Sequence, residues 1–516
     1  MPNTSPPTVK KELYGWIGVT VFLLVNAWFL NFNAFRGFNF FDFGCFMDAT
    51  WRIMHGQKPY TDFIFFVGPV HLYMCAIFYL LFGFGKWAVL VHLVAVSSAL
   101  VALTYRVARK YLSIPLAVLT SVLTGIAFYW PVSHPWYDQS AHFWGLLAFY
   151  AYLFWYPFER NRQAFWVGVL SGSAVIISLM TKTNVGTTYI PLIFFMFLIS
   201  PNFQRTVPGF FVGAFSALIV LLVCLGNPAA FYNQTFQTFS IPSQTIQRFL
   251  PFVYIPTYLL NEYWVGLLVM LYAIRSHWKK VFRLLILSLG VYALAIFTTV
   301  TGSMKTTANI PLWGPFMMLV FIAVAQVRPH LTTTRRQIEN SICTGLLVIL
   351  SFLLICNGAL RGFALEAWTY GNIDPFGTYP MKTKQLKGWL ANQRTGEAVD
   401  HLVAYLDEYA SKDDSLLVLT DLQILYLLTH HQSYKGIPFN FADGKVPSPG
   451  PQTEQVRRYI LSHPPDWVVT HRNPLYQSLV SKIVLHLGLQ EFLEKDYASI
   501  TWLNDYILLK KIKDSF

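Results

Sequence analysis

The sequence predicts a mainly α-helical, polytopic membrane protein with a small α/β domain at its C-terminal end. Hydrophobic residues make up 54% of its 516 residues and charged residues only 12%, against roughly 25% charged in soluble domains. The mean hydropathy is +0.44, so the apolar side chains are too abundant for one core to bury and must face lipid. From about Arg361 charged residues return and apolar runs shorten, which indicates a soluble domain there.

Apolar runs of about 18 to 22 residues, long enough to cross a bilayer, recur along residues 1–360. They begin near residues 14, 86, 114, 139, 164, 185, 206, 253, 281, 309 and 341, and a shorter run covers residues 70–82. We therefore predict about eleven to thirteen transmembrane helices. The first run follows Lys10 and Lys11 and lacks a small-residue cleavage site, so we expect it to remain as an uncleaved span.

The basic residues indicate the orientation of these spans. A net charge of +13 would suggest nucleic acid in a soluble protein, but here the cations cluster in short loops, so no nucleic-acid partner is expected. The positive-inside rule places these loops and the N-terminus in the cytoplasm, provided that residues 70–82 do not cross the membrane alone. The intervening loops and residues 361–516 then lie outside. The clusters fall at residues 106–110, 160–162, 205, 275–283 and 328–336.

Residues 361–516 are predicted to form a periplasmic α/β domain of three or four strands. Segments 415–420, 466–471 and 499–512 have strand character, whereas 396–411 and 473–489 have helical periodicity. No glycine-rich phosphate loop follows these strands, so no nucleotide site is expected. The domain is interpreted either as a lid or acceptor-binding cover, or as a structural appendage.

Three carboxylates lie in the first outer loop, at about residues 33–69: Asp42, Asp48 and Asp62. A carboxylate at a lipid boundary is costly unless it is paired or used. Asp48 and Arg52 are four residues apart, which favours a local ion pair. Asp42 has no basic neighbour at helical spacing and is the better candidate for a general base.

The remaining acidic candidates have alternative roles. Asp48, Asp62 and, in a later outer loop, Asp138 are candidates for a second carboxylate. For Asp138, a role in positioning donor or acceptor and a role as a helix cap are equally consistent with the sequence.

A longer pattern surrounds these carboxylates. An acidic residue soon after the first span is followed by an alanine and by a Gly-x-x-Pro-Tyr-x-Asp-Phe run that leads to a proline. In this pattern the chain resembles the GT-C glycosyltransferases, the superfamily of protein mannosyltransferases (glycosyltransferase family 39) and aminoarabinose transferases. The residues that carry the resemblance are Asp42, Phe43, Gly44, Ala49, Gly56, Pro59, Tyr60, Asp62, Phe63 and Pro69.

Further matches extend the resemblance over roughly the first 200 residues. The stretch 136–154 resembles a family segment in which Tyr-Asp or Tyr-Asn opens a span, and 178–186 resembles its Lys-x-x-x-Gly element. A membrane domain, here residues 1–360, followed by a periplasmic α/β domain is also a common family arrangement. Phe43 departs from the pattern, because many members have Glu there, and this puts metal binding in doubt.

The resemblance implies an inverting glycosyltransferase that moves a sugar from a polyprenyl-phosphate donor to a cell-envelope acceptor. The reaction would take place on the outer face of a bacterial inner membrane. Asp42 would take the proton of the acceptor hydroxyl, and fixed cations would stabilise the leaving phosphate. The acceptor can be a lipid, a polysaccharide or a protein, and membrane lipids are the other expected partners. The candidate phosphate ligands are Lys182, Lys305, His134 and Arg248.

Roles unrelated to catalysis are also consistent with the same residues. Lys182 and Lys305 are also consistent with lysines that reach to the membrane interface, and His134 with an exposed turn residue. No cofactor is expected. The five cysteines have no metal-ligand spacing, so nothing in the sequence supports a divalent metal, although metal dependence stays open.

Two other function classes are also open. A transporter or flippase of a lipid-linked saccharide would carry polar residues through the middle of several spans, and the sequence shows few. A non-catalytic membrane scaffold would make Asp42 dispensable.

Overall fold

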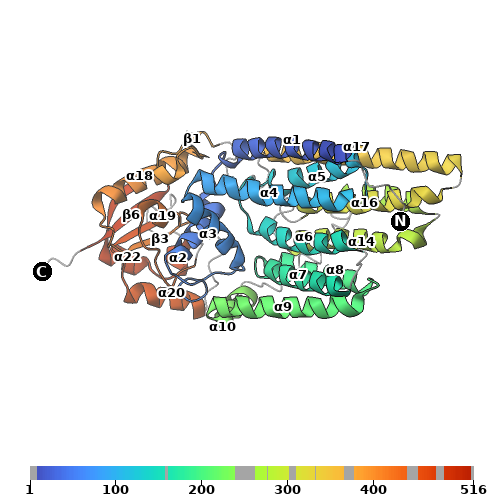
Figure 1. Ribbon diagram of the computed structural model, residues 1–516. Coiled ribbons are helices and arrows are strands. Elements are labelled where there is room, and N and C mark those ends of the chain that lie inside the picture. Colours follow the sequence, from blue (N-terminus) through green and yellow to red (C-terminus); the bar gives the residue numbers. More distant parts are fainter. Residues whose placement is uncertain are drawn as a thin grey trace. The chain divides into compact units, whose positions relative to one another are not determined.

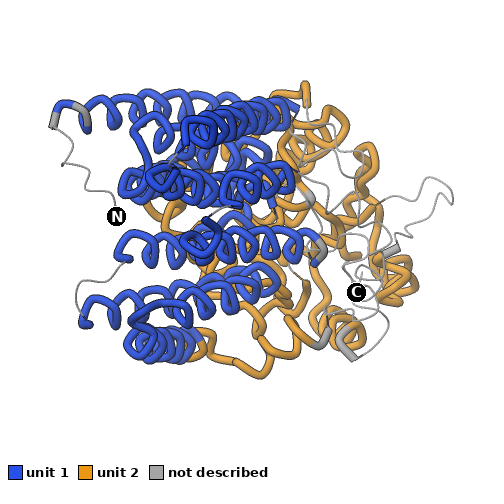
Figure 2. The backbone as a smooth tube through the Cα atoms, turned by 90° about the vertical axis from the view of Figure 1, so that its right-hand side faces the viewer, with its two compact units in different colours: residues 1–34, 90–221, 241–367 blue, residues 35–89, 222–240, 368–516 orange. Residues whose placement is uncertain are grey.

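A computed structural model describes residues 9–156, 161–238, 262–275, 277–301, 309–331, 333–364, 377–438, 451–471 and 482–512. Contacts between residues divide the chain into two compact units. Unit 1 comprises residues 1–34, 90–221 and 241–367, and unit 2 comprises residues 35–89, 222–240 and 368–516 (Figure 2). The sequence divides the chain once, near residue 360, whereas the contacts group the first loop with the C-terminal residues.

Long helices that run side by side build unit 1 (Figure 1). Each of the eleven apolar runs predicted from the sequence corresponds to one α-helix of the described residues, and α4 and α9 extend into unit 2. Seven of these segments are long and apolar enough to cross a membrane. The prediction of a mainly helical, polytopic membrane protein is thus confirmed, while the number of crossings stays a prediction. The helices are α1 (Val9–Ala34), α4 (Lys86–Arg109), α5 (Ile114–Tyr129), α6 (Tyr137–Trp155), α7 (Asn161–Leu179), α8 (Thr183–Leu198), α9 (Phe203–Leu225), α13 (Glu262–Ile274), α14 (Trp278–Thr301), α16 (Trp313–Val327) and α17 (Thr334–Ala364).

Buried polar side chains tie the helices of unit 1 together. The amide of Asn26 on α1 donates to Ser97 on α4 at 3.1 Å and accepts from the indole of Trp130 at 2.8 Å. Two turns further along α1, Asn33 donates to the Ser133 hydroxyl at 2.6 Å and to the Gly362 carbonyl at 2.7 Å. Buried hydrogen bonds of this kind fix the position of α1 along its neighbours.

Unit 2 begins with the first loop and its short helices. A π-helix, η1 (Phe40–Gly44), leads directly into α2 (Cys45–Met54), and α3 (Val70–Phe82) packs on α2. The short helices α10 (Pro228–Tyr232) and η2 (Asn233–Thr238) follow α9.

A mixed four-stranded sheet forms the centre of the C-terminal part of unit 2. The strand order is β3-β4-β6-β5, with β3 (Leu416–Leu419) and β4 (Trp467–His471) parallel and the other pairs antiparallel. A small second sheet joins β1 (Tyr379–Pro380) to β2 (Leu390–Ala391). The helices around them are α18 (Gln393–Tyr409), α19 (Leu425–Thr429), α20 (Pro451–Ser462), α21 (Lys482–His486) and α22 (Gln490–Asp496).

The structure tests the elements predicted for this part of the chain. The strands expected at 415–420 and 466–471 are confirmed as β3 and β4, and the helix expected at 396–411 as part of α18. The segment of strand character expected at 499–512 is also confirmed. It is a hairpin of β5 (Tyr497–Leu503) and β6 (Tyr506–Lys511), because Asn504 turns the chain with a φ of 55°, a conformation that Asn tolerates well. Of the helix expected at 473–489, residues 473–481 lie outside the described residues.

Candidate functional site

Asp42 lies in η1, one turn before α2. The side chain of Asn39 accepts a hydrogen bond from the Asp42 amide at 2.9 Å, and the Asn39 carbonyl accepts one from Gly44 at 2.9 Å. These bonds fix the backbone that carries the carboxylate, and Asp42 is only 7% exposed. Phe43, at the position where many GT-C members have Glu, is buried and its ring packs 5.7 Å from that of Phe38.

Asp48 and Arg52 form the predicted ion pair. The Arg52 Nε and an Asp48 carboxylate oxygen are 2.7 Å apart, and both side chains are completely buried. Ser433 donates to the other oxygen of Asp48 at 2.7 Å, and Arg52 donates to the Tyr434 carbonyl at 2.7 Å. The pair therefore joins α2 to residues that lie more than 380 positions later in the sequence.

Burial dominates the electrostatics of this pair. Removal from water raises the pKa of Asp48, while the charge and hydrogen bonds of Arg52 and the hydrogen bond from Ser433 act in the opposite direction. The guanidinium of Arg52 also lies 5.3 Å from the ring centres of Phe63 and Tyr426. Both carboxylate oxygens of Asp48 are engaged, so its geometry is that of a structural group.

Asp62 shapes a turn of the first loop. Its carboxylate accepts from the Lys58 amide at 2.8 Å and lies 3.7 Å from the ammonium of Lys435. The Asp62 carbonyl accepts from Gly436 at 2.7 Å, and Ile64 donates to the Ile437 carbonyl at 3.0 Å. The backbone of residues 62–64 thus hydrogen-bonds to that of residues 436–437 within unit 2. The side chain of Asp62 holds the turn from which these bonds are made.

Sequence reasoning missed Gln234, which binds the same loop. Its amide donates to the Tyr60 carbonyl at 3.0 Å and accepts from the Phe65 amide at 3.0 Å. Tyr60 adopts a φ of 68° and donates from its hydroxyl to the Val67 carbonyl at 2.5 Å. No local pattern signals this role, because Gln234 and Tyr60 are 174 residues apart.

In unit 1 the structure brings Asp138 and Lys182 together. They form an ion pair, with side chains 3% and 13% exposed, and the Lys182 ammonium lies 4.3 Å from the ring centre of Tyr137. Asp138 is in the first turn of α6, and Lys182 is the residue before the first turn of α8. The N-terminal ends of α6 and α8 therefore both lie at this ion pair. The N-terminal end of a helix carries a partial positive charge, which attracts anions.

The helix-cap alternative for Asp138 is wrong. Helix α6 begins at Tyr137 with Trp136 as the capping residue, which makes no side-chain capping bond. Asp138 lies inside the first turn and its carboxylate faces Lys182.

His134 is buried rather than exposed in a turn, as it is only 3% exposed. Its Nδ1 lies 2.7 Å from the Val132 carbonyl, which requires Nδ1 to donate, and its ring packs 5.2 Å from that of Trp136. Burial lowers the pKa of His134 to about 3, although the Val132 carbonyl acts in the opposite direction. His134 is therefore neutral near pH 7 and brings no positive charge to a phosphate.

The other two phosphate candidates, Arg248 and Lys305, lie outside the described residues. Among the residues that the structure does describe, no three His, Cys, Asp or Glu side chains are grouped so as to hold a metal ion.

Residues 66–227, about a third of the chain, match the family model described as dolichyl-phosphate-mannose-protein mannosyltransferase. The matched segment includes Asp138 and Lys182 and begins after Asp42. No curated protein sequence matches the chain.

Solved structures match along almost the whole chain. ArnT from Cupriavidus metallidurans in the apo state has a TM-score of 0.55 at 13% identity, over 97% of this chain and 98% of ArnT. The same protein bound to undecaprenyl phosphate has a TM-score of 0.52 at 15% identity, with the same coverage. Oligosaccharyltransferase AglB from Archaeoglobus fulgidus, in complex with an inhibitory peptide and a dolichol-phosphate, has a TM-score of 0.53 at 12% identity, over 99% of this chain and 75% of AglB.

The chain has the GT-C glycosyltransferase fold. The resemblance found at the first loop is thereby confirmed at the level of the fold. The family match and the GT-C fold together indicate a membrane glycosyltransferase.

Proposed function

We propose that the protein is an inverting glycosyltransferase that moves a sugar from a polyprenyl-phosphate donor to a cell-envelope acceptor. The observation that carries the proposal is the likeness of fold over 97% of the chain to ArnT, a protein that binds undecaprenyl phosphate. Such a lipid phosphate has the chemistry of the leaving group in the proposed reaction.

The proposed step is a single displacement. The acceptor hydroxyl oxygen attacks the anomeric carbon of the sugar, and the bond from that carbon to the phosphate oxygen breaks. The phosphate leaves with the electron pair, and the hydroxyl proton passes to the carboxylate of Asp42. One positioned base contributes about 10²- to 10⁴-fold to the rate of such a reaction, and the phosphate needs no acid because it leaves as a stable anion.

Lys182 is the proposed ligand of the donor phosphate. Its ammonium is held by Asp138 and lies against the ring of Tyr137, so a phosphate would meet a cation whose position is already fixed. Lys305 and Arg248 are further proposed ligands. We assign His134 at most a hydrogen bond, because burial keeps its ring neutral.

The proposed location is a bacterial inner membrane, with the N-terminus cytoplasmic and the reaction on the outer face. The distribution of basic residues between alternate loops supports this orientation. The acceptor is a lipid, a polysaccharide or a protein of the cell envelope.

Purified protein in liposomes tests the proposal against the transporter alternative. A panel of radiolabelled polyprenyl-phosphate sugars is added to the outside together with envelope acceptors. We expect label to move from at least one donor to an acceptor, with the anomeric configuration inverted. Label that crosses the membrane still attached to its lipid, without transfer, would support a flippase instead. Transfer with retained configuration would rule out the single displacement.

A further inference from the structure

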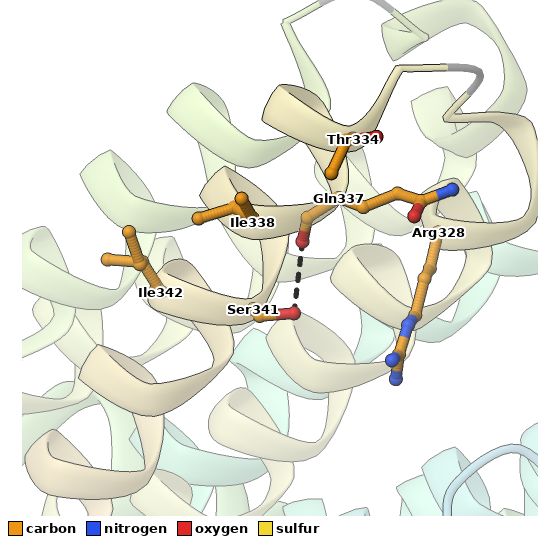
Figure 3. A pocket seen from close by; sticks show the side chains of 6 residues that line it. All are labelled: Arg328, Thr334, Gln337, Ile338, Ser341 and Ile342. Carbon is orange, nitrogen blue, oxygen red and sulfur yellow. Dashed lines mark hydrogen bonds between the residues drawn. The ribbon is translucent and has the colours of Figure 1, made fainter.

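Unit 1 carries a pocket that the proposed reaction does not use, beside the beginning of α17. Figure 3 shows the side chains that line it, and its volume is about 480 Å³. Arg328 comes from η5 (Arg328–His330), directly after α16, and the other lining residues come from the first turns of α17. The pocket thus combines a cation, two hydroxyls and an amide with two aliphatic side chains. Its lining residues are Arg328, Thr334, Gln337, Ile338, Ser341 and Ile342.

The charge around the pocket is strongly positive. Glu339 is the one acidic residue in the sequence between positions 277 and 341. It is already engaged by Arg275 at 2.5 Å and by Arg335 at 3.3 Å. Within the described ranges, no carboxylate forms an ion pair with Arg328.

The surroundings of His277, close to η5, contain the same excess of positive charge. The rings of His277 and His330 lie 6.0 Å apart, so the turn between α13 and α14 lies beside η5. Desolvation lowers the pKa of His277, and the charges of Lys280, His330 and Arg336 lower it further. An anion is the ligand that such surroundings attract.

An exposed apolar stripe continues from the pocket along α17. Its residues recur every three or four positions, so they share one face of the helix. Their exposed fractions lie between 49% and 58%. They are Ile338, Ile342, Leu346, Ile349 and Leu353.

We propose that this pocket binds the headgroup of an anionic glycerophospholipid. Its phosphate lies at Arg328, and an acyl chain follows the stripe from Ile338. A phosphate joined to an aliphatic chain matches both parts of this surface, whereas a soluble anion matches only the first.

The pocket is distant from the proposed donor ligand within the same unit. Asn184, on the first turn of α8 after Lys182, donates to the Thr301 hydroxyl at the end of α14 at 3.4 Å. Arg328 of the pocket shares η5 with His330, whose ring lies 6.0 Å from that of His277, the residue before α14. Since α14 has 24 residues, about 36 Å of helix separates these positions. The lipid therefore occupies a site of its own.

Native mass spectrometry of the full chain in detergent tests this site. The probes are dioleoyl phosphatidylglycerol, dioleoyl phosphatidylcholine and inorganic phosphate. We expect the anionic lipid to be retained at least fivefold better than the zwitterionic one. Arg328→Gln should weaken retention of phosphatidylglycerol about fivefold, the effect of one cation near an anionic lipid. Arg336→Gln removes the same charge from an exposed residue of α17 that does not line the pocket, and should change retention less than twofold.

Three results would overturn the proposal. Equal retention of the two lipids would remove the anion preference. Equal losses from Arg328→Gln and Arg336→Gln would reveal a general surface attraction instead of a site. Inorganic phosphate that binds as tightly as phosphatidylglycerol would exclude a contribution from the acyl chain. Both variants alter exposed side chains, so their melting temperatures should match that of the natural chain.

Discussion

Asp42 and Asp48 are close in sequence but differ in their surroundings. Asp48 is completely buried, and both of its oxygens are engaged by Arg52 and Ser433. Asp42 lies in the π-helix η1, whose backbone donates two hydrogen bonds to Asn39. At the residue scale, Asp48 is therefore suited to hold α2 in place, and Asp42 stays the proposed base.

Replacement of Arg52 by Met should lower the local free energy of unfolding around α2 by about 3 to 5 kcal/mol, because Asp48 would stay buried without its cation. The double variant Asp48→Asn, Arg52→Met should recover part of this loss. Hydrogen exchange of the α2 and β3 amides measures the effect.

The exposed pair Arg394 and Asp505, with side chains 65% and 40% exposed, supplies the control. Arg394→Gln should cost about 1 kcal/mol or less. An Arg52→Met effect as small as that of the control would contradict a structural role for the buried pair.

His134 predicts a pH dependence of stability. Its pKa is lowered to about 3 by burial, below the value of about 6.5 in an unfolded chain. The unfolded state therefore binds the proton more readily, so stability is complete above about pH 6.5 and falls as the pH drops towards 3. At pH 5.5, one unit below the value in the unfolded chain, the loss is on the order of 1 kcal/mol.

Thermal unfolding at pH 7.5 and 5.5 measures this dependence. His134→Gln should reduce the difference between the two pH values, whereas His330→Gln, at an exposed position, should keep it. An unchanged pH dependence in His134→Gln would show that another group is responsible.

At the scale of elements, α7 and α9 approach closely through small residues. Gly168 and Gly172 on α7 face Gly209 and Gly213 on α9, and a Cβ at Gly172 would overlap the carbonyl oxygen of Phe210. Pairs of glycines four residues apart allow two backbones to touch in a membrane, where apolar side chains gain little from leaving lipid.

Gly172→Ala should lower the melting temperature markedly, because the added methyl group meets backbone rather than a side chain that can move. Gly345 on α17 is the matched control, since a Cβ there would have open space around it. Gly345→Ala should be neutral or stabilising by up to about 1 kcal/mol. Similar melting temperatures for the two variants would contradict the close α7–α9 contact.

At the scale of the whole molecule, the features that the sequence predicts are those that depend on residues close together along the chain. The helices follow from long apolar runs, and the Asp48–Arg52 pair follows from a spacing of four residues. The Asp138–Lys182 pair was not predicted, although both residues were candidates, because their contact depends on how α6 and α8 pack.

Contacts distant in sequence escape prediction for the same reason. Gln234 binds the Tyr60 backbone across 174 residues, and Ser433 reaches Asp48 across 385. Such bonds exist only after packing has brought the segments together. The first loop therefore shares a compact unit with the C-terminal residues, a grouping that composition along the chain does not reveal.

The central claim is that a single carboxylate, Asp42, accepts the proton in a glycosyl transfer. Asp42→Asn keeps the shape of the side chain and removes its basicity, and Asp413→Asn makes the same change at an exposed residue of unit 2. Transfer of radiolabelled sugar and binding of the donor are measured for both variants in parallel. We expect Asp42→Asn to bind donor normally and to transfer about 10²- to 10⁴-fold more slowly, while Asp413→Asn transfers at the natural rate. Equal transfer by the two variants would contradict the claim and direct the search for the base to Asp138.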